Sequence, residues 1–250
     1  MADRLVMGSY GPATYGDSIA DVYDDWHEHV FDTPTTVDFL AELAGAGPAL
    51  ELGIGTGRVA LPLAHKGIEV QGIDASVAMV QKLRAKPGGE DVGVTIGDFA
   101  AVDVEGTFSL VFVVFNTLFG LLTQRDQVAC FANVSGRLTS DGVFVCECFV
   151  PDLARFKGHQ RIAVERVEVD EVVLETSRHD LVNQRVRSTH TAVGRAGTRI
   201  YPVEIRYAWP SELDLMAELA GLRLRSRFSG WNKEPFNSAS TNHVSVYEKA

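Results

Sequence analysis

Between residues 49 and 149 the chain alternates short apolar runs with segments whose apolar residues recur at helical spacing. An almost continuously apolar run such as 109–115 is typical of a parallel strand that is covered on both faces. Because parallel strands are joined by crossover connections that are usually helices, this alternation predicts an α/β fold with a doubly wound parallel sheet. Helices are expected at 59–64, 75–84 and 127–138, and strands at 49–53, 68–74, 92–96, 109–115 and 143–149, the last after a turn at 140–142.

A different pattern begins after Pro151. One polar face on each of the next strand-like runs suits an antiparallel sheet, which we expect to serve as a substrate lid, a dimer surface or both. A helix at 212–220 and strands at 222–228 and 244–247 then return to the first sheet. The alternating runs lie at 162–169, 172–176, 185–193 and 199–207, with a hairpin turn at 194–197 between the last two.

Two helices are expected before the first strand. The second covers 35–44 and ends at the glycine- and proline-containing run 45–48. We therefore predict a helical lid at 1–47, a Rossmann-like domain at 48–150 and 209–250, and an inserted sheet at 151–208. The first helix carries one apolar face made by Ile19, Val22, Tyr23, Trp26 and Val30.

The net charge, the lengths of the apolar runs and the cysteines limit the classes of partner that we expect for this chain. A net charge of −10 repels a phosphate polyanion, so a small-molecule substrate is favoured over nucleic acid. The apolar runs are too short to cross a bilayer and no apolar signal region follows the first residues, so we expect a cytoplasmic protein without a membrane partner. Cys146 and Cys148 share one strand face without a nearby histidine, which predicts apolar packing and no metal site. A homodimer is compatible with the inserted sheet.

A glycine-rich turn joins the first expected strand directly to a helix, with glycines at 53, 55 and 57. Glycines at such a turn let the backbone approach a ligand closely and point amide groups at it. A dinucleotide fingerprint would place another glycine at the position of Arg58, and the acidic Glu51 suits a cationic group better than a pyrophosphate. S-adenosylmethionine (SAM) carries an ammonium and a sulfonium. The turn therefore favours SAM over NAD.

Two further acids follow at the ends of the next two strands. Asp74 lies about twenty residues after the first glycine, where an acid can accept both ribose hydroxyls. Its alternative role is to cap the helix that follows. Asp98 could receive the adenine amino group while Phe99 covers the ring. Ala75 and Met79, which follow Asp74, are assigned to the same cofactor site.

These residues, in this order, resemble the class I SAM-dependent methyltransferases over Tyr15–Phe149. The resemblance implies a seven-stranded sheet whose last strand is antiparallel, with Phe115, Asn116 and Thr117 lining the reaction centre.

Within that superfamily the layout looks like the bacterial N-methyltransferases of deoxyaminosugar biosynthesis, which contribute to antibiotics and other specialised metabolites. In those enzymes the tyrosine matching Tyr15 reaches the cofactor and the amine, and the one matching Tyr23 touches the cofactor. Such enzymes can carry a histidine shortly after the fourth strand, and this chain has none there. The shared features are Tyr15, Tyr23, Asp24, the inserted sheet, and the order Glu147, Phe149, Pro151, Asp152.

The absence of this histidine helps to decide whether a nitrogen or an oxygen of the acceptor attacks the methyl group. A hydroxyl needs a base during methyl transfer, whereas the proton of a neutral amine can leave afterwards, so N-methylation is favoured, with a deoxyaminosugar or its nucleotide-linked form as the expected acceptor. Tyr15 and Glu147 are the candidate catalytic residues, the latter as an attractor of a substrate ammonium. Trp26, His27, Phe149 and Trp231 could wall the substrate pocket, or belong to the core. His159, His179 and His190 are expected to be surface or strand-face residues of the insertion.

Three alternatives stay open on the sequence. The first is an O-methyltransferase of a phenol, sugar or polyketide, and the second is a non-catalytic SAM-binding module that recruits another protein. The third, an NAD-dependent oxidoreductase, is disfavoured by Glu51 and Arg58.

Overall fold

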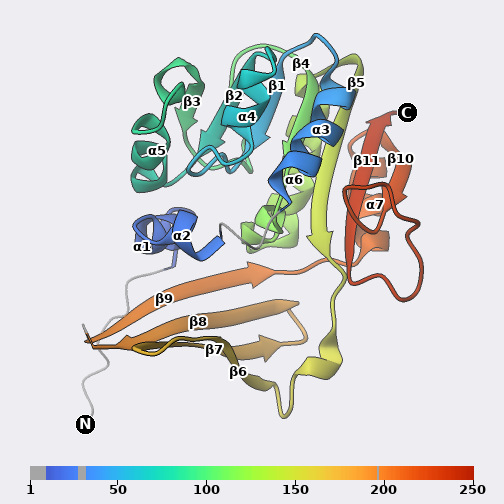
Figure 1. The fold of residues 1–250 in the computed structure, drawn as a ribbon. Helices are drawn as coiled ribbons and strands as arrows, with labels where there is room; N and C mark the ends of the chain where they lie inside the picture. Colours follow the sequence, from blue (N-terminus) through green and yellow to red (C-terminus); the bar gives the residue numbers. More distant parts are fainter. Residues whose placement is uncertain (1–9, 28–31, 196) are drawn as a thin grey trace.

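A computed structural model describes residues 10–27, 32–195 and 197–250 (Figure 1). Val30, assigned to the first helix, and Ala196, within the expected hairpin turn, lie outside the described residues. Figure 1 shows a large sheet with helices on both faces and a smaller sheet beyond the end of β5 (Leu138–Phe149), where this strand leaves the large sheet. The helices α1 (Thr14–Ile19) and α2 (Tyr23–His27) lie between the two sheets.

The large sheet has seven strands in the order β10-β11-β5-β4-β1-β2-β3. Its central strands pair in parallel, and β11 runs antiparallel to both of its neighbours. The prediction of a doubly wound sheet with an antiparallel last strand is therefore confirmed. Besides β5, the strands are β1 (Ala49–Leu52), β2 (Val70–Asp74), β3 (Gly93–Ile96), β4 (Phe108–Val113), β10 (Leu222–Phe228) and β11 (Asn242–Lys249).

Two apolar layers cover the sheet. On one face α6 (Gln124–Arg137) and α7 (Pro210–Leu219) cover β5, and this layer buries three free cysteines, Cys130 of α6 and Cys146 and Cys148 of β5. On the other face lie α3 (Thr33–Ala44), α4 (Ala60–His65) and α5 (Val77–Arg84). The predicted apolar packing of the cysteines is confirmed. Among the described helices, none combines the length and apolarity that a bilayer crossing requires.

The small sheet is an antiparallel meander inserted between β5 and α7, as predicted. One face carries Val173, Ala192 and Tyr201, which form a separate apolar cluster with Ile19 of α1. The inserted sheet therefore holds the N-terminal helices through apolar contacts. Its strands are β6 (Gln160–Val167), β7 (Glu171–Asp180), β8 (Arg185–Gly194) and β9 (Gly197–Arg206).

Polar contacts attach the same two helices to the large sheet. Asp17 accepts a hydrogen bond from the Ser76 hydroxyl at 2.6 Å, and Asp24 accepts one from Thr56 at 2.7 Å. Asp21 pairs with Lys82 at 2.8 Å and Asp24 with Lys86 at 2.7 Å. The N-terminal helices are thus joined to one sheet by charge and to the other by apolar burial.

Two sequence expectations are corrected. The single first helix is divided into α1 and α2, because the Val22 amide bonds Ile19 in a tight turn between them and the two aspartates on either side are drawn onto the large sheet. The turn at 140–142 is an irregularity within β5, whose pairing with β4 shifts between Phe108 and Leu110. Gly142 permits it, since a Cβ there would lie 2.8 Å from the Phe108 carbonyl oxygen.

Candidate active site

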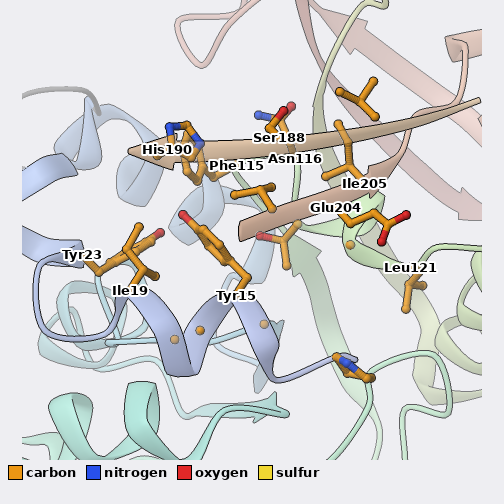
Figure 2. A pocket seen from close by; sticks show the side chains of 18 of the residues that line it. Tyr15, Ile19, Tyr23, Phe115, Asn116, Leu121, Ser188, His190, Glu204 and Ile205 are labelled. Carbon is orange, nitrogen blue, oxygen red and sulfur yellow. The ribbon is translucent and has the colours of Figure 1, made fainter. Parts of the chain in front are cut away.

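A cavity of about 1000 Å³ lies at the carboxyl ends of the central strands (Figure 2). Its walls come from the strand ends, from α1 and α2, and from the inserted sheet. Open α/β sheets bind ligands in this location. The predicted residues that line it are Tyr15, Tyr23, Trp26, His27, Glu51, Gly53, Gly55, Arg58, Asp74, Ala75, Met79, Asp98, Phe99, Phe115, Asn116, Thr117 and Phe149.

The glycine-rich turn after β1 needs its glycines for two reasons. Gly53 and Gly55 both have positive φ angles, of 72° and 55°, and both line the cavity. A Cβ on Gly53 would lie 2.5 Å from the Thr117 methyl carbon, so the backbone can face the cavity only without a side chain. Gly57 does not line the cavity, and a Cβ there would collide with Leu83 at 2.9 Å. Its assignment to the cofactor is therefore replaced by a packing role.

Glu51 is buried at the start of this turn, with 3% of its surface exposed. Burial raises the pKa of its carboxyl group to about 8, in spite of the opposing attraction of Arg58. Its Oε2 atom has no hydrogen-bond partner among the described residues. A buried acceptor without a donor is costly unless a ligand supplies one. The ammonium group of SAM is such a donor, so the residues present fit this cofactor.

Glu51 should therefore release a proton when SAM binds. Because its pKa is about 8 without ligand, the carboxyl group is protonated near neutral pH, and a neighbouring ammonium group favours the carboxylate. Calorimetry in buffers of different ionisation enthalpy at about pH 6.5 should show about one proton released per SAM bound. The Glu51→Gln variant should show none. Equal proton release by the two proteins would contradict contact between Glu51 and the ammonium group.

Asp74 ends β2 with both carboxylate oxygens on backbone amides. Oδ2 accepts from Gly55 and Oδ1 accepts from Ser76, each at 2.8 Å. Burial raises the pKa of this carboxyl group, and the hydrogen bonds oppose the rise. The alternative role as helix cap is wrong, because Ser76 is the N-cap of α5 and accepts from the Met79 amide. Asp74 instead fixes the glycine turn while facing the cavity.

Asp98 lies at the end of β3, where its Oδ1 accepts a hydrogen bond from the Ala100 amide at 2.8 Å. It is exposed and lines the same cavity as Asp74 and Glu51. The structure therefore brings the three acids together, as the order of the strands predicted. The next residue, Phe99, also lines this cavity.

Tyr15 of α1 and Tyr23 of α2 line the cavity across from the strand ends. Figure 2 shows Tyr15 rising from α1 with its hydroxyl directed into the pocket. Burial raises the pKa of Tyr15 far above its usual range and that of Tyr23 to about 12, so both remain neutral phenols. Tyr23 also stacks on His27, with 4.6 Å between ring centroids.

The end of β4 is held in an uncommon conformation. Phe115 and Asn116 have positive φ angles of 54° and 61°, which cost free energy in residues other than glycine. The Phe115 amide donates to the Glu147 carboxylate at 2.7 Å, and the Asn116 side chain accepts from the Phe149 amide at 2.6 Å. These contacts hold both residues at the cavity wall.

Glu147 itself is outside the cavity wall. Its second oxygen accepts a hydrogen bond from the indole nitrogen of Trp231 at 3.0 Å, and burial raises the pKa of its carboxyl group. Trp231 packs against Phe39 and does not line the cavity either. The predicted contact of Glu147 with a substrate ammonium is not supported, because both oxygens bind protein donors. Glu147 positions Phe115.

The inserted sheet supplies functional candidates that the sequence did not single out. His190, expected on a surface or strand face, lines the cavity together with Glu165, Glu175 and Ser188. The sequence pattern of the inserted strands indicated that one face of each is buried, but it did not indicate which residues pack against that face. His179 is buried against Tyr207 and His159 is exposed, and neither lines the cavity. Within the part of the chain that the structure describes, no cluster of His, Cys, Asp or Glu could hold a metal ion.

Comparisons with known proteins agree with this geometry. The family described as "Methyltransferase domain" matches residues 49–142. The solved CcbJ methyltransferase from Streptomyces caelestis is 41% identical, with a TM-score of 0.91 over 96% of this chain and 100% of that chain. The cypemycin N-terminal methyltransferase of a Streptomyces species is 27% identical over 80% of this chain and 82% of the relative.

A more distant structure shares the fold alone. CalS10, an amino pentose methyltransferase from Micromonospora echinaspora solved with SAM bound, is 24% identical with a TM-score of 0.64, over 88% of this chain and 91% of that chain. The similarity to CcbJ covers 96% of this chain at 41% identity, and the matched domain includes the glycine turn, Asp74 and Asp98. The chain belongs to the SAM-dependent methyltransferases.

Proposed function

We propose that this enzyme methylates the amine nitrogen of a small molecule, with a deoxyaminosugar in specialised-metabolite biosynthesis as the first candidate acceptor. The observation that carries the proposal is the acidic lining of the acceptor half of the cavity. Glu175 and Glu204 in this lining pair with arginines and Glu165 contacts His190, whereas Asp126 and Asp152 form no ion pair among the described residues. Such a lining attracts a cationic ammonium group.

The arginines in this half of the cavity are already paired. Arg155 lies 3.4 Å from Glu175, and Arg166 pairs with Glu171 and lies over the Trp26 ring. A pyrophosphate would find no arginine there without breaking an ion pair. The lining therefore favours an acceptor without a nucleotide over a nucleotide-linked sugar.

We assign the other half of the cavity to SAM. Glu51 would accept from its ammonium group, Asp74 from its ribose hydroxyls and Asp98 from its adenine amine. Arg58 would pair with its carboxylate. When bound, SAM supplies a methyl group that moves to the acceptor nitrogen as the carbon–sulfur bond breaks. Tyr15 and Phe115 would then border the reacting atoms, hold them in line and exclude water.

The proposal is tested by a screen with methyl-labelled SAM. The acceptors are methyl glycosides of amino-deoxysugars, their nucleotide-linked forms, a peptide with a free N-terminus, and phenols. The peptide is included because the cypemycin relative is described as an N-terminal methyltransferase. We expect label on a sugar amine, with more transfer to the glycoside than to the nucleotide form.

Two results would contradict the proposal. Label on hydroxyl acceptors alone would make the enzyme an O-methyltransferase. A clear thermal shift with SAM but no transfer to any acceptor would favour the non-catalytic binding module, since a ligand that binds only the folded state stabilises it.

A further inference from the structure

We propose that His190 and Glu165 form an acid–base pair that takes a proton from the acceptor ammonium group before methyl transfer. The inference rests on the proposed function, because it requires an amine acceptor. It gives the insertion a chemical role in addition to covering the site.

The two side chains meet across the inserted sheet. His190 is on β8 and Glu165 on β6, with β7 between them, and His190 Nδ1 lies 2.7 Å from Glu165 Oε2. Both line the cavity, with 23% and 37% of their side chains exposed. Because a carboxylate can only accept, Nδ1 carries a proton, and in the neutral ring the lone pair is then on Nε2. A carboxylate that orients a histidine in this way is a recurring device of general-base catalysis.

A bulge in β6 gives Glu165 this reach. Val164 pairs with Leu174 and Arg166 with Val173, which leaves Glu165 as the extra residue of its strand. Bulges re-aim side chains and are frequent beside active sites. The contact between His190 and Glu165 therefore depends on the backbone register of β6, and it reaches across β7, which lies between the two strands.

The pair belongs to the part of the cavity where the methyl group must arrive. Burial raises the pKa of Tyr15, and the charge of Glu165 adds to that rise. Burial lowers the pKa of His27; the neighbouring His190 lowers it too, and Glu165 opposes the fall. The His27 ring in turn meets Phe115 edge-on at 5.4 Å. Figure 2 shows the Tyr15 hydroxyl directed towards the region that holds His190 and Phe115.

Groups from several elements surround His190. They are Glu165 and Arg166 from β6, Glu175 from β7, Tyr201 from β9, Tyr15 from α1 and His27 from α2. Glu175 is occupied by Arg155, Arg161 and Ser177. Glu165, whose pKa is lowered by its bond to His190, is the carboxylate that this histidine engages.

A neutral amine needs no base during methyl transfer, but an acceptor that arrives as an ammonium group must lose a proton first. An alkylamine resembles lysine, whose pKa of about 10.4 leaves it protonated at neutral pH, so no lone pair can attack the methyl carbon. In the proposed step an N–H bond of the ammonium breaks, its proton passes to His190 Nε2, and the electron pair stays on nitrogen. Glu165 stabilises the resulting imidazolium. The proton leaves to solvent once the methylated product has gone.

The main experiment compares His190→Asn with wild type over a range of pH, using the amine found by the labelled-methyl screen. At pH near 7 we expect kcat/KM to fall about 100-fold, the size typical of a lost general base. The loss should vanish as the pH approaches the pKa of the amine itself, because the free amine then needs no base. His159→Asn, an exposed histidine of the same insertion, is the matched control and should follow wild type.

A second measurement needs no acceptor. ¹⁵N NMR of His190 in the complex with S-adenosylhomocysteine should show the Nδ1–H tautomer in wild type, and a shift towards Nε2–H in Glu165→Ala, which has no acceptor for Nδ1–H. Unchanged thermal stabilisation by S-adenosylhomocysteine would show that both variants fold.

The outcomes separate this inference from the proposed function. If wild type methylates an amine but His190→Asn loses the same factor at every pH, or nothing, the acid–base role is overturned and N-methylation stands. An unchanged tautomer in Glu165→Ala overturns the pair. If wild type methylates only hydroxyl groups, N-methylation and the ammonium as proton source both fall.

Discussion

Replacing Asp74 with alanine is expected to weaken SAM binding about 1000-fold, because two hydrogen bonds to a carboxylate contribute about 1.5–3 kcal/mol each. The same change removes the acceptor that holds the Gly55 amide, so the glycine turn would also lose its anchor. Isothermal calorimetry with SAM and with S-adenosylhomocysteine measures the loss directly. Both ligands share the ribose and should be affected alike.

The matched control is Asp141→Ala. Asp141 is an exposed aspartate in the irregular part of β5, at the opposite end of that strand from the cavity. It should bind SAM as wild type does. An undiminished affinity in Asp74→Ala would remove Asp74 from the site and with it the assignment of the ribose.

Replacing Glu147 with alanine is expected to destabilise the protein by about 3 kcal/mol, since each buried donor left without an acceptor costs about 1–3 kcal/mol. The donors are the Phe115 amide and the Trp231 indole nitrogen. Glu147→Gln should lose about half as much, because one amide oxygen can serve only one of them. Urea unfolding followed by fluorescence measures both variants.

The control for this series is Glu248→Ala. Glu248 lies on the neighbouring strand β11 and forms a surface ion pair with Arg223 at 2.7 Å. Such pairs contribute about 0–1 kcal/mol. Stability losses of equal size in Glu147→Ala and Glu248→Ala would contradict the role of Glu147 as the anchor of the β4 turn.

The sheet and the cofactor half of the site followed from the sequence for a physical reason. Parallel strands covered on both faces are continuous apolar runs, and their carboxyl ends meet at one edge. Glu51, Asp74 and Asp98, which lie at or near the ends of three such strands, therefore had to approach one another. Both inferences, the parallel sheet and the approach of the three acids, use only the local pattern of each strand and the shared direction of parallel strands.

Contacts between distant segments could not be predicted in this way. The donors to Glu147 lie 32 and 84 residues away in the chain, so strand alternation could place its side chain opposite the cysteines but not name its partners. Glu165 and His190 are 25 residues apart and meet only because of a bulge, which shifts the register without a sequence signal strong enough to predict it. The aspartates that divide the first helix act through equally distant partners.

The double attachment of α1 and α2 has a consequence for how ligands enter and leave. Dissolved salt screens ion pairs such as Asp21–Lys82 but leaves an apolar cluster intact, and sulfate strengthens it. Rising ionic strength should therefore loosen these helices from α5 while they stay docked on the inserted sheet. SAM would then enter and leave on the side where the helices have loosened, and its exchange rate would rise with the salt concentration.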